Sequence, residues 1–121
     1  MIKGVGNDII EISRIQNVIK RHGKRFLDKV FTQKEQQYCL KHKESERHFA
    51  GRFAAKEAIV KALGCGLKEG ISWLDFEILN DAAGKPILHL SPLIQKRFNN
   101  PEVLLSISHC KSYATAVAIW V

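Results

Sequence analysis

The fold is decided by the stretch His48-Phe49-Ala50-Gly51-Arg52-Phe53-Ala54-Ala55-Lys56-Glu57-Ala58, which predicts a long helix with one unusually small face. Alanines stand at positions 50, 54, 58 and 62, and residues four apart lie one above another on a helix. Such a stripe of small side chains lets another element approach the helix backbone closely. We therefore predict a helix over residues 45–63, ended by Gly64-Cys65-Gly66, because glycine is the usual residue of a left-handed C-terminal cap.

The chain before this helix predicts a strand and a first helix. Residues 2–6 are short, apolar and broken by glycine, as in a strand, and Asp8 follows at the point where the chain leaves it. Ser13 and Gln16 have the spacing of a capping box. Isoleucines recur behind them at helical spacing, so we predict a helix over residues 13–22.

A second capping box and a strand-rich second half complete the pattern. Thr32 and Glu35 form that box, and they open a polar helix toward residue 43. After residue 70, apolar and polar residues alternate with period two between turn-forming stretches. This predicts strands at about 75–78, 86–90, 103–109 and 113–121, a turn at 80–86, a helix at 91–98, and an antiparallel hairpin formed by the last two strands.

These elements predict one α+β domain over residues 1–121, with an antiparallel sheet packed on the long helix. The length suits a single domain, and the chain shows no repeat, low-complexity tract or linker. A domain of this size exposes a large share of its surface, so oligomerisation would help to stabilise it.

The composition indicates a cytoplasmic protein with an anionic partner. No apolar run approaches the roughly 20 residues of a membrane span, and the N-terminus lacks a cleavable signal pattern. Cys39, Cys65 and Cys110 have neither metal-ligand spacing nor an even count, which indicates reduced thiols. The net charge of +7 favours a nucleic acid, an anionic lipid, an acidic protein or a phosphorylated small molecule, or serves only solubility.

Two carboxylates and a lysine are the first candidates for chemistry. Glu57 and Lys61 stand four apart and share a face of the predicted helix, either as a surface ion pair or as part of a site. Asp8 is either a turn aspartate or a partner of Glu57. If the two acids meet, they need a cation or a shared proton, and an all-oxygen site suits magnesium.

A histidine and a basic cluster are the next candidates. His109 ends the stretch Ser106-Ile107-Ser108-His109, where it contacts phosphate, moves a proton or bonds only to backbone. Basic side chains gather at Arg14, Lys20, Arg21, Lys24 and Arg25, either as a solvated face or as a docking face for an acidic protein. Single-stranded nucleic acid is disfavoured there because Phe26 is the one aromatic residue nearby.

In these motifs and in their order, the whole chain resembles the bacterial holo-acyl-carrier-protein synthase family. The motifs are Gly6-Asn7-Asp8-Ile9, Phe31-Thr32 with Glu35, residues 52–58 with Lys61-Ala62 and Gly64-Cys65-Gly66, Gly84-Lys85-Pro86, and Ser106-Ile107-Ser108-His109. Asn7 and Cys65 depart from the apolar and hydroxyl-bearing residues usual there, and neither is an expected ligand.

The resemblance implies a 4′-phosphopantetheinyl transferase-like fold, a homotrimer with sites at its subunit interfaces, and a role in fatty acid biosynthesis. It implies that a carrier-protein serine attacks the phosphorus that bears the pantetheine arm of coenzyme A, and that adenosine 3′,5′-bisphosphate leaves. Asp8 and Glu57 would bind Mg²⁺, and Lys61 would add positive charge. Glu57, or a water on the metal, would take the serine proton.

The resemblance also implies two binding surfaces. An acidic acyl carrier protein would dock on Arg14, Arg21, Lys24 and Arg25. Neither nucleic acid nor a membrane is an expected partner, although a basic nucleic-acid module and a coenzyme A-binding protein without chemistry are the rival hypotheses. The residues expected to bind coenzyme A are Arg52, Phe53, Lys61, Gly64, Gly84, Lys85, Pro86, Ser108 and His109.

Overall fold

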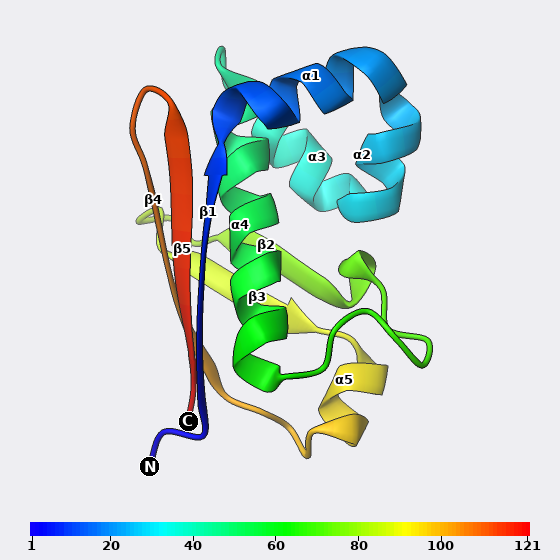
Figure 1. Ribbon diagram of the computed structural model, residues 1–121, viewed down its shortest axis with the longest axis vertical. Coiled ribbons are helices and arrows are strands. Elements are labelled where there is room, and N and C mark those ends of the chain that lie inside the picture. Colours follow the sequence, from blue (N-terminus) through cyan, green and yellow to red (C-terminus); the bar gives the residue numbers. More distant parts are fainter.

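Helix α4, Ser45–Leu63, runs through the middle of the molecule in the computed structural model, which describes all residues from 1 to 121 (Figure 1). The other elements surround it on several sides. In chain order they are β1 (Gly4–Glu11), α1 (Ile12–His22), α2 (Lys24–Val30), α3 (Gln33–Leu40), the 3₁₀ turn η1 (Trp73–Asp75), β2 (Phe76–Asn80), β3 (Pro86–Leu90), α5 (Pro92–Arg97), β4 (Val103–His109) and β5 (Tyr113–Trp120).

Two separate antiparallel sheets flank α4. The larger has the strand order β1-β5-β4, and the smaller is the β2-β3 hairpin on the other side of the helix (Figure 1). In the larger sheet Asp8 of β1 and Ile107 of β4 both lie opposite Ala116 of β5. Because side chains alternate along a strand, this row of three residues faces α4.

Very small side chains bring α4 against the larger sheet. A Cβ atom added to Gly4 would lie 2.0 Å from the carbonyl oxygen of Ala62. A Cβ atom added to Gly6 would lie 2.0 Å from the carbonyl oxygen of Ala58. On the central strand the residues that face the helix are also small and buried: Ala114, Ala116 and Ala118. Glycine in β1 is therefore a requirement of packing, because any side chain would collide with the helix backbone.

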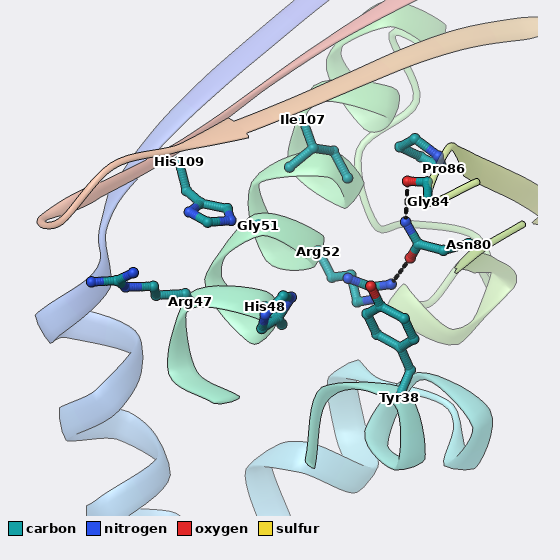
Figure 2. A pocket seen from close by; sticks show the side chains of 10 residues that line it. All are labelled: Tyr38, Arg47, His48, Gly51, Arg52, Asn80, Gly84, Pro86, Ile107 and His109. Carbon is teal, nitrogen blue, oxygen red and sulfur yellow. Dashed lines mark hydrogen bonds between the residues drawn. The ribbon is translucent and has the colours of Figure 1, made fainter. Parts of the chain in front are cut away.

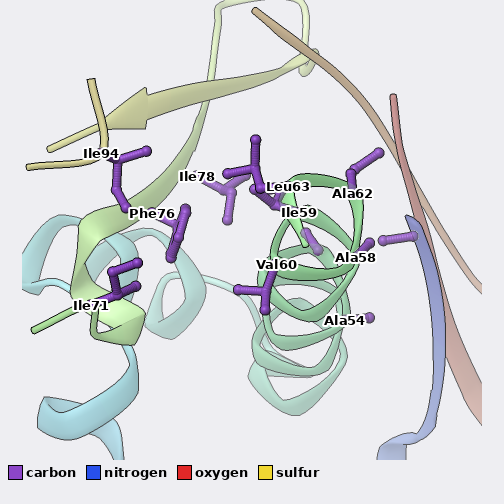
Figure 3. Packing of buried hydrophobic residues seen from close by; sticks show 13 residues of the cluster. Ala54, Ala58, Ile59, Val60, Ala62, Leu63, Ile71, Phe76, Ile78 and Ile94 are labelled. Carbon is purple, nitrogen blue, oxygen red and sulfur yellow. The ribbon is translucent and has the colours of Figure 1, made fainter. Parts of the chain in front are cut away.

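Larger side chains fill the space between α4 and the hairpin. Ile59 and Leu63 of the helix pack with Phe76 and Ile78 of β2, and Ile94 of α5 joins the same cluster (Figure 3). A second cluster lies where α1, α2 and α3 cover the N-terminal part of α4. Its residues are Ile12, Ile15, Leu27, Val30, Phe31, Cys39, Phe49, Ala50 and Ala114.

A buried ion pair joins these two clusters, and the sequence motifs did not predict it. The Lys56 ammonium donates to Glu35 Oε1 at 2.8 Å and to the carbonyls of Val30 and Trp73 at 2.8 and 3.0 Å. Glu35 Oε2 accepts the Ile78 N–H at 2.8 Å. Both side chains are fully buried, and burial lowers the pKa of Lys56 while Glu35 opposes that shift. The pair ties α3, α4 and β2 together.

Most predicted elements are confirmed. Helix α4 has the predicted bounds, and Gly64 caps it with a left-handed φ of 69°. Thr32 and Glu35 make the reciprocal hydrogen bonds of a capping box, although the helix ends at Leu40, before residue 43. Ser91 caps α5, and β4 and β5 form the predicted hairpin.

Two local predictions are wrong, one helix was missed, and the sheet arrangement differs from the expected one. Strand β1 continues to Glu11 because β5 pairs with all of it, so Asp8 lies within the strand. Ser13 does not cap α1, which begins at Ile12 directly after the strand; the Ile12 N–H instead donates to the carbonyl of Ser112 at 2.9 Å. Helix α2 was not predicted, and the expected single sheet is two sheets.

The three cysteines are free thiols. None of the helices combines the length and the apolar character that a membrane crossing requires.

We predict that Gly6→Ala strongly destabilises the fold, because the new methyl group would lie 2.0 Å from the Ala58 oxygen and 2.7 Å from the Ala62 nitrogen. Overpacking of a tight contact costs about 1–3 kcal/mol, and here backbone must move, which places the cost at or above the top of that range. Urea unfolding measures it. Gly51→Ala is the matched control, since its methyl group would meet a side-chain atom, Cγ2 of Ile107 at 3.1 Å, and no backbone atom of another element. Equal stability of the two variants would contradict the packing argument.

Candidate active site

One group of charged side chains lies where β1 meets α4. Asp8 follows Gly4 and Gly6 on the face of the strand that turns toward the helix. Lys61 reaches across from α4, and its ammonium donates to Asp8 Oδ1 at 3.2 Å and to the Asn7 carbonyl at 3.0 Å. The Asp8 side chain is 18% exposed and that of Lys61 is 53% exposed. Lys61 therefore pairs with the strand acid.

Glu57 completes this group on the helix. Partial burial raises the pKa of its carboxyl group, the negative charge of Asp8 raises it further, and Lys61 opposes the shift. The negative charges of the two acids therefore interact, and a bound cation would relieve their repulsion. No third carboxylate, histidine or cysteine joins them in a metal-binding cluster. Two carboxylates with open positions suit Mg²⁺, which keeps waters and binds substrate phosphates.

A pocket of about 210 Å³ lies on the other flank of α4 (Figure 2). It opens between the N-terminal half of the helix, the end of β4 and the hairpin turn. Its lining residues are Tyr38, Arg47, His48, Gly51, Arg52, Asn80, Gly84, Pro86, Ile107 and His109.

Arg52 is the fixed cation of this pocket. Its side chain is buried, Nε donates to the Ile78 carbonyl at 3.1 Å, and the guanidinium also donates to Asn80 (Figure 2). Asn80 in turn donates to the Gly84 carbonyl at 2.8 Å, and the guanidinium carbon lies 4.2 Å from the Tyr38 ring centre. No carboxylate pairs with Arg52, so its charge is available to an anion.

Aromatic and imidazole rings form another part of the wall. The His48 ring lies between His42, with ring centres 3.7 Å apart, and His109, at 5.9 Å. Burial lowers the pKa of His48 to about 4, and the charges of His42, Arg52, His109 and Arg47 lower it in the same direction. A rim of cations and ring faces suits a phosphorylated ligand with a planar group.

The two groups lie on opposite edges of the three-stranded sheet. Asp8 belongs to β1 and Ile107 to β4, with Ala116 of the central strand between them. Adjacent strands are spaced about 4.8 Å, so the two edges are roughly 10 Å apart, and α4 packs over β1 and the central strand. One ligand would have to pass around the helix to contact both groups of a single chain.

The structure divides the expected coenzyme A residues. Arg52, Gly84, Pro86 and His109 line the pocket, and Lys61 lies with the acids. The others lie elsewhere: Phe53 packs on Trp73 with ring centres 5.4 Å apart, Gly64 ends α4, Lys85 is exposed in the hairpin turn, and Ser108 is on the outer sheet face.

Several pocket residues were not predicted. Arg47 stands four residues before Gly51, and His48 stands four residues before Arg52. Residues four apart share a helix face, so helical spacing from Arg52 could have predicted His48. Tyr38 and Asn80 come from distant segments, and sequence spacing gives no signal for them.

The predicted basic face is exposed. Ile12 and Ile15 bury the opposite side of α1, so Arg14 and Arg21 face away from the core. Lys24 and Arg25 open α2, where Lys24 pairs with Asp28 at 3.1 Å. The four cations thus lie on two consecutive helices at one end of the molecule (Figure 1).

The chain is similar to known proteins over its whole length. Residues 4–118 match the family model described as 4′-phosphopantetheinyl transferase superfamily. A holo-[acyl-carrier-protein] synthase of Protochlamydia amoebophila is 62% identical over 120 residues, which are 99% of this chain and 98% of that protein. A crystal structure of the Bacillus anthracis synthase in complex with CoA (3′,5′-ADP) has 39% identity and a TM-score of 0.84, covering 99% of this chain and 96% of that one. The Helicobacter pylori synthase in complex with coenzyme A has 35% identity and a TM-score of 0.87, covering 97% and 99%.

Proposed function

Because the chain belongs to the 4′-phosphopantetheinyl transferase superfamily, we propose that it carries out the reaction of its holo-[acyl-carrier-protein] synthase relatives. It transfers the 4′-phosphopantetheine group of coenzyme A to a serine of an apo-acyl carrier protein, in support of fatty acid biosynthesis. The observation that carries the proposal is the pairing of a two-carboxylate, one-lysine group with a cationic pocket in a fold that matches coenzyme A-bound synthases.

The carboxylates of Asp8 and Glu57 would hold a magnesium ion. Their charges repel in the free protein, and only Lys61 offsets them. A bound Mg²⁺ supplies charge stabilisation to the diphosphate of the substrate. The protein is thus proposed to be magnesium-dependent, as the oxygen-only donor set favours.

The reacting groups of the chain have separate tasks. The Lys61 ammonium lies beside Asp8 at the exposed edge of the group and compensates negative charge that builds on the phosphoryl oxygens. As the carrier serine forms its bond to the phosphorus, its proton passes to the Glu57 carboxylate. The bond to adenosine 3′,5′-bisphosphate breaks, and that group leaves.

The pocket would hold the nucleotide end of coenzyme A. Arg52 and Arg47 offer positive charge to its phosphates, and Tyr38 and Pro86 offer flat, apolar surface to the base. Arg14, Arg21, Lys24 and Arg25 would dock the acidic carrier, because opposite charges speed encounter and orient the partner. The free thiols agree with a cytoplasmic setting.

A homotrimer would unite the two halves of the site. The outer face of the larger sheet exposes large apolar side chains: Val5 and Ile9 are 61% and 66% exposed, and Leu104 is also exposed. Val5 and Leu104 both lie opposite Ile119, which makes one apolar row across three strands. Such a face favours association. A ring of copies places the β1 edge of one beside the β4 edge of the next, a heterologous contact that closes on itself.

The direct test is to incubate the protein with coenzyme A, Mg²⁺ and an apo-acyl carrier protein and to weigh the carrier by mass spectrometry. We expect the mass gain of one phosphopantetheine arm per carrier. Asp8→Asn and Glu57→Gln should each slow transfer at least about a hundredfold while the fold survives, and chelation of Mg²⁺ should do the same. Glu102→Gln, at an exposed glutamate, is the control. Wild-type transfer by either site variant would refute the metal assignment.

Sharing of the site between copies has its own test. A chain with Glu57→Gln and a chain with Arg47→Ala and His109→Ala should each be nearly inactive alone. When the two are co-expressed in equal amounts, a site is intact if its acid half and its pocket half are both wild-type. With equal amounts of the two chains, each half of a shared site is wild-type with a probability of one half. About a quarter of the sites are then intact, so about a quarter of wild-type activity should return. A mixture as inactive as its components would show that each chain carries its whole site.

A further inference from the structure

Three histidines from different parts of the chain lie close together, and two of them, His48 and His109, line the pocket. His48 belongs to α4, His109 ends β4, and His42 lies in the turn between α3 and α4. The His42 and His48 rings are nearly stacked, with an interplanar angle of 31°. His42 Nδ1–H donates to the Tyr38 carbonyl at 3.0 Å, because a carbonyl oxygen only accepts.

The groups around His48 are almost all cationic or neutral. Arg47 and Arg52 lie on its own helix, and Tyr38 of α3 lies 5.8 Å away, ring centre to ring centre. The Lys41 ammonium lies 5.5 Å from the centre of the same Tyr38 ring. The one carboxylate paired in this region is Glu44, which bonds Arg47 at 3.0 Å. In the free protein, burial first and these charges second lower the pKa of His48 to about 4, so its ring is unprotonated at neutral pH.

We propose that a phosphate entering this pocket draws one proton from solvent onto His48, whose ring then becomes a third phosphate-binding cation beside Arg47 and Arg52. The proton adds to a ring nitrogen, and no bond of the ligand breaks. A dianion favours the protonated ring, because its two negative charges offset the guanidinium charges of Arg47 and Arg52 that disfavour the proton in the free protein. The identity of the ligand rests on the proposed function, whereas the proton uptake rests on the histidine geometry.

The sign of the effect follows from linkage. A group whose pKa rises on binding adds affinity that is complete below the pKa of the free protein. That affinity is lost as the pH rises through the pKa of the complex. Nucleotide affinity should therefore strengthen as the pH falls, by up to about tenfold per pH unit between these two values.

Calorimetry measures the proton directly. Adenosine 3′,5′-bisphosphate is titrated into the full-length protein at about pH 7.5, where its phosphates carry few protons, in buffers that differ in ionisation enthalpy. We expect net proton uptake in the wild-type protein. His48→Phe keeps a ring against His42 but cannot take a proton, so uptake should fall and the affinity should lose its pH dependence. His89→Gln, at an exposed histidine of β3, is the matched control and should behave as the wild type.

Two outcomes separate this inference from the proposed function. Binding without proton uptake in the wild type, or equal uptake in His48→Phe, would overturn the inference and leave phosphopantetheine transfer standing. If carrier modification fails but inorganic sulfate, which does not titrate near neutral pH, still causes proton uptake that depends on His48, the proposed function is overturned and the inference is supported.

Discussion

The contact of Gly6 with the backbone of Ala58 and Ala62 is the constraint on which the rest of the structure depends. It fixes both the height and the rotation of α4 over the larger sheet. Because every second residue of a strand faces the same side, this contact also determines that Asp8 turns toward the helix. Asp8 then pairs with Lys61 at 3.2 Å, and its charge acts on Glu57 of the same helix. A packing requirement thereby places two acids of distant sequence in one group.

The buried pair of Glu35 and Lys56 plays the corresponding part for the pocket. Through Glu35 it holds the Ile78 N–H of β2, and the Ile78 carbonyl holds Arg52. The ion pair therefore positions the strand that positions the pocket cation. Loss of one partner of such a pair leaves an uncompensated buried charge, which costs about 3–5 kcal/mol. Stability and site geometry here depend on the same hydrogen bonds.

Structural features that depend on the spacing of nearby residues were predicted correctly from the sequence. The alanine stripe of α4, its glycine cap and the Thr32 capping box follow from spacing and were confirmed. The end of β1 was wrong because pairing with β5, a partner over 100 residues away, extends the strand past Asp8. The partner of Lys61 was open for a similar reason, since helical spacing favours Glu57 and only the fold brings Asp8 within 3.2 Å. Pocket residues such as Tyr38 and Asn80 became apparent only from the tertiary structure.

The central claim is that the acid group and the nucleotide pocket, on opposite flanks of α4, serve one substrate held between two copies of the chain. A crystal structure with coenzyme A and Mn²⁺ in place of Mg²⁺, with anomalous scattering collected for manganese, tests it most directly. The account predicts an anomalous peak between the Asp8 and Glu57 carboxylates, with the ligand's nucleotide in the pocket of a neighbouring copy. A peak elsewhere, or a nucleotide bound only in the pocket of the chain that holds the metal, would contradict it.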